Sequence, residues 1–285
     1  MNNKTRAIRL LSHARQFDDK SIKSVGTLRA YIACLKIFFD WCDTNGVSSS
    51  TRSSKQFLVA FLEEKAEIYQ QKTLCQHRMA LNAAFHKQLA FIPSKLDTVL
   101  HARNYQLSEL LQLIQHIQVR NAISILICYF AGLRAHELAT LQRLNENTRS
   151  STRSWNGNLF AFETNHTIYI VTGKGGLKRH VAIPNELVSI IELRRFPTPK
   201  TVRDREIYYQ QNYDIGFGKS LSQCFTRSSL KHLGWSTGLH GLRHSYAKNR
   251  IKKLLSHGYE LEAARLIVSQ ELGHFRSSVV NCYLR

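Results

Sequence analysis

"HTIYIVTGKGGLKRHVAIP" (residues 166–184) alternates apolar and polar side chains on both sides of a glycine-rich turn. Isoleucines alternate before the turn, and Val181 and Ile183 alternate after it. Alternation with a period of two is typical of strands with one buried face, and closely spaced glycines allow a tight turn. The stretch therefore predicts an antiparallel hairpin with Lys174 at its tip.

Outside this hairpin the pattern is helical. Residues 25–42 place their apolar side chains on one helical face, and "TNGVSSS" follows as a stop and a loop. Further helices are expected at 55–70, 73–90, 121–133 and from His240 onward, and 145–158 is a polar loop. The predicted fold class is mainly α with a small antiparallel β-sheet.

Two domains are expected from the break in this pattern. "FIPSKLDTVLHARNYQ" interrupts the helices with a proline and polar residues, which is typical of a linker. We predict a helical N-terminal domain over residues 1–92, a linker over 93–106, and a mixed α+β domain over 107–285.

Charge indicates the partner. The 285 residues carry 40 Lys+Arg against 20 Asp+Glu, a net charge of +20 with a pI near 10.0. Such an excess favours a polyanion such as nucleic acid over the alternative of a generally basic, solvated surface. A membrane partner is not expected, because no basic amphipathic run stands out.

The cysteines and the N-terminus predict a compartment. Six cysteines show no C-x-x-C spacing, which favours reduced thiols over a zinc ribbon or a disulfide framework. The N-terminus lacks the apolar core of a signal peptide, and no stretch reaches the length of a membrane span. We expect a cytoplasmic protein that associates with the nucleoid.

Six polar residues lie where structure alone does not require them. These are Arg134, Lys174, His240, Arg243, His274 and Tyr283. Together they match the needs of attack on a phosphodiester: arginines for the non-bridging oxygens, a lysine or histidine as proton donor, and a hydroxyl nucleophile.

The alternative is attack by a hydroxide generated from metal-bound water. That reaction needs clustered carboxylates, which this sequence does not offer. His240 and His244 have a spacing that can bind zinc, but Arg243 lies between them and no third ligand is evident. "TGKGG" follows no nucleotide-binding pattern. Neither a metal nor a cofactor is expected.

Five motifs occur in one order along the chain, and together they resemble the tyrosine recombinase (phage integrase) family. They are "AGLRAHEL", "VTGKGGLKRHVAIP", "HGLRHSYA", "ELGHFRSS" and "VVNCYLR". The main motifs cover the catalytic half, from about 108 to 285, and "TLRAYIACLKIFFDWC" resembles the helical core-binding domain of that family. The resemblance therefore implies a core-DNA-binding domain at 1–92 and a tyrosine-recombinase catalytic domain at 107–285. The resemblance implies that Arg134 and Arg243 bind the non-bridging oxygens of the scissile phosphate and that His274 hydrogen-bonds it.

The other three residues would carry the covalent chemistry. The resemblance implies that Tyr283 attacks the phosphate and holds the DNA 3′ end as a phosphotyrosyl ester. Lys174 would protonate the departing 5′ oxygen, and His240 would assist proton transfer at the nucleophile. The chain departs from the family at Gly241, where an aspartate is common, and by having only two residues after Tyr283.

The implied function is site-specific recombination of double-stranded DNA by a homo-tetramer on two duplexes, with integration or excision of a mobile element as the favoured process. Accessory DNA-bending or directionality factors are a further partner class. Two alternatives remain open from the sequence. One is a DNA-binding regulator that retains the fold without catalysis, and the other is a relaxing enzyme of the type IB topoisomerase kind.

Overall fold

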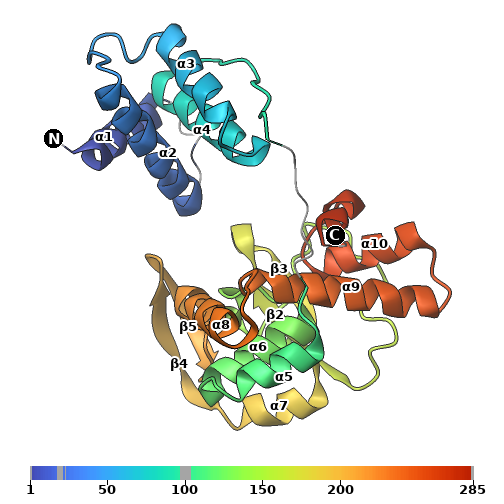
Figure 1. Ribbon diagram of the computed structural model, residues 1–285. Helices are drawn as coiled ribbons and strands as arrows, with labels where there is room; N and C mark the ends of the chain where they lie inside the picture. Colours follow the sequence, from blue (N-terminus) through green and yellow to red (C-terminus); the bar gives the residue numbers. More distant parts are fainter. Residues whose placement is uncertain (1, 18–21, 23, 97–103, 284–285) are drawn as a thin grey trace. The chain divides into compact units, whose positions relative to one another are not determined.

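The chain divides into two compact units in the computed structural model, Met1–Leu100 and His101–Arg285 (Figure 1). The structure describes residues 2–17, 22, 24–96 and 104–283. The central part of the predicted linker, 97–103, lies outside the described residues, as do the two residues after Tyr283. The predicted domain limits therefore stay predictions.

The first unit is helical throughout its described part. Its helices are α1 (Asn3–Phe17), α2 (Val25–Thr44), α3 (Lys55–Ala66) and α4 (Gln71–Phe85). The Phe38 ring meets Phe61 and Phe85 edge-on, with centroids 5.2 and 5.7 Å away. The three helices predicted here are confirmed, although α3 and α4 each end several residues early.

Helix α1 was not predicted. Ala7 and Leu11 are fully buried within the helical core of this unit, where α1 contacts α2. Most other positions of α1 are polar or basic, so its apolar stripe is too narrow to predict a helix from periodicity alone. Tertiary contact with α2 supplies the burial that the local pattern lacks.

The second unit combines helices with two small sheets. Its elements are α5 (Leu107–Ile114), α6 (Val119–Ala131), β1 (Gln142–Arg143), β2 (His166–Thr172), β3 (Lys178–Pro184), α7 (Asn185–Glu192), β4 (Arg195–Asp204), β5 (Ile207–Tyr213), α8 (Gly218–Leu233), α9 (His240–Ser256) and α10 (Leu261–Glu271). Short 3₁₀ turns follow α6 at Glu137–Thr140, form the hairpin turn at Lys174–Gly176, and precede Tyr283 at Ser277–Cys282.

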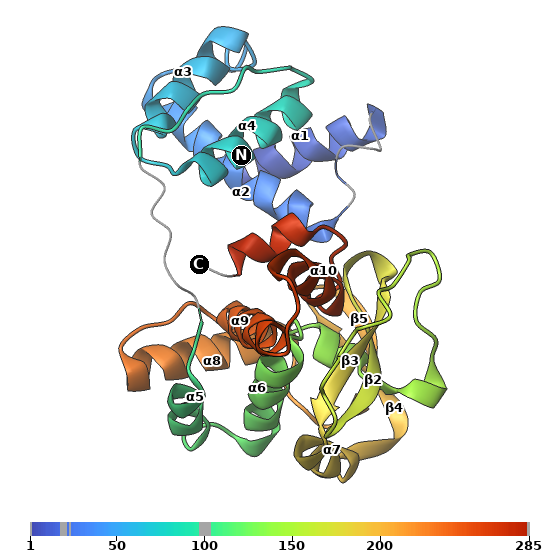
Figure 2. The ribbon, with the colours of Figure 1, turned by 90° about the vertical axis from the view of Figure 1, so that its right-hand side faces the viewer.

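The predicted hairpin is present as β2 and β3. Ile168 pairs with Ala182 and Tyr169 with Val181, in antiparallel register, and β1 adds a third strand beside β2. Figure 2 shows the two strands side by side with α7 at the end opposite the turn. The fold class predicted from the sequence is confirmed.

A second hairpin, β4–β5, was not predicted. Its strands pair antiparallel with an irregularity between Arg195 and Lys200, and most side chains of β4 and the first half of β5 are exposed. Because neither face of this part is buried, the sequence shows no clean apolar alternation, and two prolines in β4 weaken the strand pattern further.

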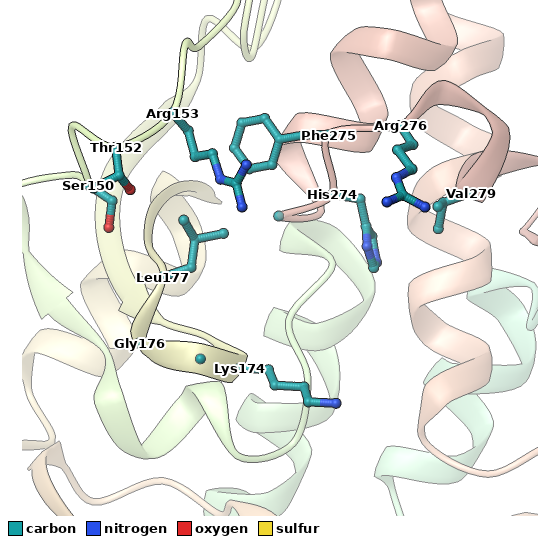
Figure 3. A pocket seen from close by; sticks show the side chains of 12 residues that line it. Ser150, Thr152, Arg153, Lys174, Gly176, Leu177, His274, Phe275, Arg276 and Val279 are labelled. Atoms are coloured by element: carbon teal, nitrogen blue, oxygen red, sulfur yellow. The ribbon is translucent and has the colours of Figure 1, made fainter. Parts of the chain in front are cut away.

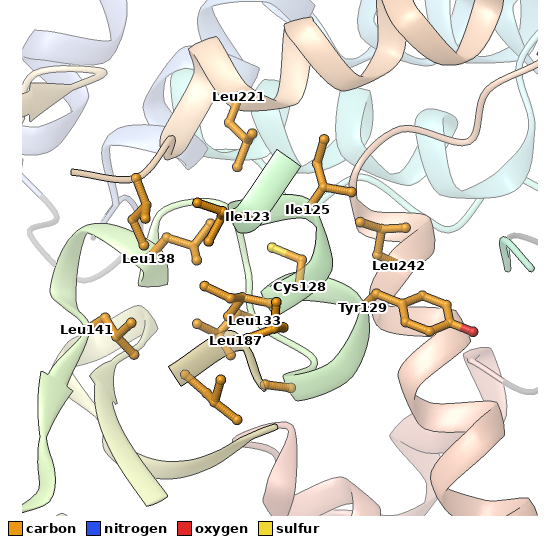
Figure 4. Packing of buried hydrophobic residues seen from close by; sticks show 14 of the residues in the cluster. Ile123, Ile125, Cys128, Tyr129, Leu133, Leu138, Leu141, Leu187, Leu221 and Leu242 are labelled. Atoms are coloured by element: carbon orange, nitrogen blue, oxygen red, sulfur yellow. The ribbon is translucent and has the colours of Figure 1, made fainter. Parts of the chain in front are cut away.

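Two apolar clusters hold the second unit together. The larger one surrounds α6, whose Ile123, Ile125 and Cys128 contact side chains from the sheet and from the neighbouring helices (Figure 4). The smaller cluster joins α9 and α10 to the last described residues of the chain and includes Val280 and Tyr283. The C-terminal segment is therefore part of the core.

Candidate active site

Arg134 lies just beyond α6, in a turn that begins at Gly132. Gly132 has a φ of +63°, which glycine adopts without steric cost. A Cβ at this position would lie 2.6 Å from the Tyr246 ring and 2.8 Å from Leu272. The turn brings the backbone N–H and Nη1 of Arg134 to the Glu137 carboxylate, at 2.8 and 2.7 Å. Arg134 and Glu137 thus meet across a turn rather than along a helical face.

Glu137 is a fully buried carboxylate among arginines. Arg134 Nη1 and Arg179 Nη2 each contact it at 2.7 Å. Burial alone would raise the pKa of Glu137, but Arg179, Arg243 and Arg134 together hold that pKa well below its usual range. Glu137 therefore stays ionised and orients the guanidinium groups around it.

Arg179 was missed by the sequence analysis. This β3 residue is 1% exposed, and its Nη1 donates to the Glu271 carbonyl at 2.6 Å while Nη2 binds Glu137. A Cβ at Gly273, where φ is +72°, would lie 3.0 Å from the Arg179 Cδ atom. Arg179 thus connects the Arg134 turn to the segment that carries His274. A sign was available, because Arg179 is two residues before Val181 and shares its buried strand face.

Arg243 extends from α9 and is almost completely buried. Nη1 donates to the Gly132 carbonyl at 2.5 Å, Nη2 donates to the Leu272 carbonyl, and Nε donates to the Tyr283 hydroxyl at 3.3 Å. Burial, followed by the nearby charge of Arg134, lowers the pKa of Arg243 to about 10. The side chain is still a cation at neutral pH.

Tyr283 reaches the site from the 3₁₀ turn that ends the described chain. Its side chain is in the smaller apolar cluster, and the residue is 4% exposed. The hydroxyl lies 3.3 Å from His274 Nε2 as well as 3.3 Å from Arg243 Nε, and His274 Nε2 lies 3.2 Å from Arg134 Nη2. Four of the six predicted residues thus form one hydrogen-bonded cluster.

His274 is neutral at physiological pH in this environment. Burial, and then the guanidinium groups of Arg243 and Arg134, lower the pKa of His274 to about 4. A guanidinium can only donate, so Nε2 accepts from Arg134 and the ring proton is assigned to Nδ1. Nε2 has a single lone pair, so the Tyr283 hydroxyl, which accepts from Arg243 Nε, competes with the Arg134 guanidinium for this acceptor.

The remaining two predicted residues lie around this cluster. His240, the first residue of α9, has its ring centroid 5.9 Å from that of Tyr283, and His244 lies at 4.8 Å. Lys174 is exposed at the hairpin turn and lines a pocket of about 780 Å³ together with His274 (Figure 3). The structure thus places all six residues in one region of the second unit.

Within the described residues, no group of three or more His, Cys, Asp or Glu side chains is arranged to hold a metal ion. All six cysteines are free thiols, three of them buried. Over the same described ranges, no helix is both long enough and apolar enough to cross a membrane.

Comparison with known proteins places this site in context. No protein-family model matches the chain. The chain is 23% identical over 299 residues to the tyrosine recombinase XerA of Pyrococcus furiosus, and the match covers 100% of the chain and 92% of that relative. The chain is therefore similar to a tyrosine recombinase along its whole length.

Solved tyrosine recombinase structures share the fold. The post-cleavage complex of the XerH site-specific recombinase with a palindromic difH substrate superimposes with a TM-score of 0.62 at 16% identity, covering 99% of this chain and 81% of that one. A lambda integrase dimer bound to a COC′ core site superimposes with a TM-score of 0.61 at 14% identity, covering 97% of this chain and 76% of that one. The Tn1549 transposon integrase in complex with transposon right end DNA superimposes with a TM-score of 0.53 at 12% identity, covering 98% of this chain and 94% of that one.

A second buried ion-pair network supports the cluster around Tyr283. Glu271, at the end of α10, accepts hydrogen bonds from Tyr246 at 2.8 Å and from Arg250 at 2.7 and 3.0 Å. Arg250 also binds Glu163 at 2.6 Å. Glu271 is three residues from His274, so these bonds fix the approach of the C-terminal segment to α9. The roles of the six predicted residues stay predictions.

Proposed function

We propose that this protein is a site-specific DNA recombinase that cleaves and rejoins duplex DNA through a 3′-phosphotyrosyl intermediate, without metal or ATP. The observation that carries the proposal is the position of the Tyr283 hydroxyl, 3.3 Å from both Arg243 Nε and His274 Nε2. A phenol in contact with a guanidinium and a neutral imidazole has a cation to stabilise its oxyanion and a base to take its proton.

The proposed cleavage step forms the bond from the Tyr283 oxygen to phosphorus and breaks the bond from phosphorus to the 5′ oxygen. Arg134 and Arg243 hold the non-bridging oxygens, and Lys174 supplies a proton to the departing 5′ oxygen. The tyrosine proton passes to a histidine. The sequence favours His240 for this step. His274 Nε2 lies 3.3 Å from the hydroxyl, but its lowered pKa of about 4 makes it a weak base for a phenol.

Rejoining is the reverse reaction. The phosphotyrosyl ester retains the energy of the original diester, so a DNA 5′ hydroxyl can displace Tyr283 and no nucleotide cofactor is consumed. Loss of one group that stabilises the charged transition state is expected to cost about 3 kcal/mol, by analogy with oxyanion donors. The net charge of +20 supports a DNA partner.

The proposed assembly is a homo-tetramer that exchanges strands between two double-stranded recombination sites, assisted by accessory DNA-bending or directionality factors. Integration or excision of a mobile element is the proposed process. Support comes from relatives of this fold: XerH and the Tn1549 integrase were solved on DNA, and lambda integrase was solved as a dimer on a core site.

A covalent-trapping assay tests the proposal. Duplexes that bind tightly are first selected from a randomised library. A nick is then placed a few nucleotides 3′ of the cleavage position on the same strand, so that the short fragment carrying the new 5′ hydroxyl diffuses away after cleavage. Wild type should accumulate a protein–DNA adduct stable to denaturant, and Tyr283→Phe should bind equally well without forming it.

Two outcomes would replace the proposal. Tight binding of wild type to its selected duplex without any adduct would support a regulator. Relaxation of supercoiled plasmid regardless of sequence would support a topoisomerase.

A further inference from the structure

The polar loop at 145–158 is attached to the active-site region. Ser150 and Lys178 exchange hydrogen bonds at 3.0 and 2.9 Å, which ties the loop to β3. The Trp155 indole donates to the Ser150 carbonyl at 2.8 Å, and the Asn156 N–H donates to the Gln270 side chain at 2.6 Å. Contacts at both ends therefore position the residues between Ser150 and Asn156.

Each of the two arginines of this loop, Arg149 and Arg153, lies beside an aromatic ring. Trp155 meets Phe275 at 4.9 Å between ring centroids. The Arg153 guanidinium lies 5.4 Å from the Phe275 ring, and that of Arg149 lies 5.0 Å from the Trp155 ring. Arg153 lines the pocket that contains Lys174 and also a neighbouring depression, whereas Arg149 lines only that depression.

The shared pocket is cationic. Arg153, Lys174, His274 and Arg276 line it, and the described residues of its lining include no carboxylate. Figure 3 shows the Arg153 side chain beside Phe275, with its guanidinium directed into the pocket from the wall opposite Lys174. Ser150 and Thr152 add hydroxyl groups to the same wall. Arg153 is exposed and makes no ion pair with any carboxylate that the structure describes.

We propose that this pocket binds a second backbone phosphate, next to the scissile one on the same DNA strand, and that Arg153 is the residue that recognises it. The inference rests on the proposed function. A guanidinium suits a phosphodiester because it is always charged and can donate two parallel hydrogen bonds. The Phe275 ring, itself packed against Trp155, lies beside the Arg153 guanidinium and restricts that side chain, which lowers the entropy lost on binding. His274 lines the pocket for the second phosphate and is also expected to contact the scissile phosphate. A phosphate bound in the pocket therefore aligns the scissile phosphate.

The test measures DNA binding in a Tyr283→Phe background, where no covalent step interferes. The probe is a duplex selected from a randomised library, together with a series in which single phosphates around the cleavage position are replaced by neutral methylphosphonates. Arg153→Gln should weaken binding to the unmodified duplex about tenfold and reduce the slope of log K against log salt by about one. Arg153→Lys, which keeps the charge but not the paired donors, should lose less.

The phosphate beside the scissile one is the position in the methylphosphonate series that tests the role of Arg153. A neutral group at the phosphate beside the scissile one should weaken binding of the Arg153 protein and have no further effect on Arg153→Gln. Arg149→Gln is the matched control, because it removes the same charge from the same loop outside the pocket, and it should retain the full response. Equal effects of the two variants, or additive effects at every position, would overturn the inference.

The two proposals fail differently. If wild type forms no adduct on the nicked duplex, recombination is wrong, while the binding comparison can still succeed. If the adduct forms and Arg153→Gln behaves like Arg149→Gln, recombination stands and the second phosphate position is wrong.

Discussion

Arg179 shows how much of this site depends on a side chain that never needs to contact DNA. It lies between the Glu137 carboxylate and the Glu271 carbonyl, so it joins the arginine turn after α6 to the segment bearing His274. The glycine-rich motif of the same hairpin predicted Lys174 as a site residue and gave no indication of Arg179. A cation on the buried face of a strand requires a buried anion, and Glu137 is that anion.

Replacing Arg179 with glutamine should lower the free energy of unfolding by about 3 kcal/mol, because a buried carboxylate loses one of its partners. Urea denaturation at neutral pH measures the change. Adduct formation, tested where the variant is fully folded, should fall by at least about tenfold, since Arg134 and His274 lose their common support. Normal adduct yield in the folded variant would limit Arg179 to a purely structural role.

His274 should make the folded protein sensitive to mild acid. Its folded pKa is lowered to about 4 from an ordinary value of 6.5, so the unfolded chain takes up a proton in that interval while the folded chain does not. Stability contributed by the neutral imidazole is therefore complete above pH 6.5 and is lost as the pH falls toward 4.

The comparison that isolates this effect is wild type against His274→Asn, unfolded by urea at pH 7 and at pH 4.5. Wild type should lose more stability than the variant over this interval. His77, whose pKa burial also lowers to about 4, is common to both proteins and cancels in the difference. Parallel losses in the two proteins would contradict the assignment.

At the scale of elements, burial decides what the sequence can predict. The β2–β3 hairpin and the helix at 25–42 were predicted because each buries one regular face. Helix α1 and the β4–β5 hairpin were not, because α1 has few buried positions and the hairpin is largely exposed. The same rule applies to the candidate site: motif order predicted Arg134 and Tyr283, but only the fold shows that Arg179 joins the Arg134 turn to the segment bearing His274.

Gly132→Ala tests the turn that places Arg134. A methyl group there would approach Tyr246 and Leu272 closer than normal contact, in addition to the cost of a positive φ. The free energy of unfolding should fall by more than about 2 kcal/mol. Gly234→Ala is the matched control, because Gly234 also follows a helix of the same unit with φ of +78° but has open space around it. It should cost only about 1 kcal/mol.

At the scale of the whole molecule, charge is the dominant property. The excess of twenty positive charges predicts that DNA binding falls linearly on a plot of log K against log salt, with a slope of about −0.9 for each phosphate neutralised. Between 50 and 200 mM salt, six or more phosphate contacts would reduce the affinity about a thousandfold. Fluorescence anisotropy with a labelled duplex measures this slope, and a flat response would contradict a phosphate-binding surface.

The burial of Tyr283 has a consequence for fidelity. The proposed nucleophile is 4% exposed and hydrogen-bonded to Arg243 and His274, so a phosphodiester does not reach it by simple collision. In the proposed reaction the DNA would have to replace both hydrogen bonds before the phenol could attack. Under that proposal, duplexes that bind only through the basic surface would leave Tyr283 covered and would stay uncleaved.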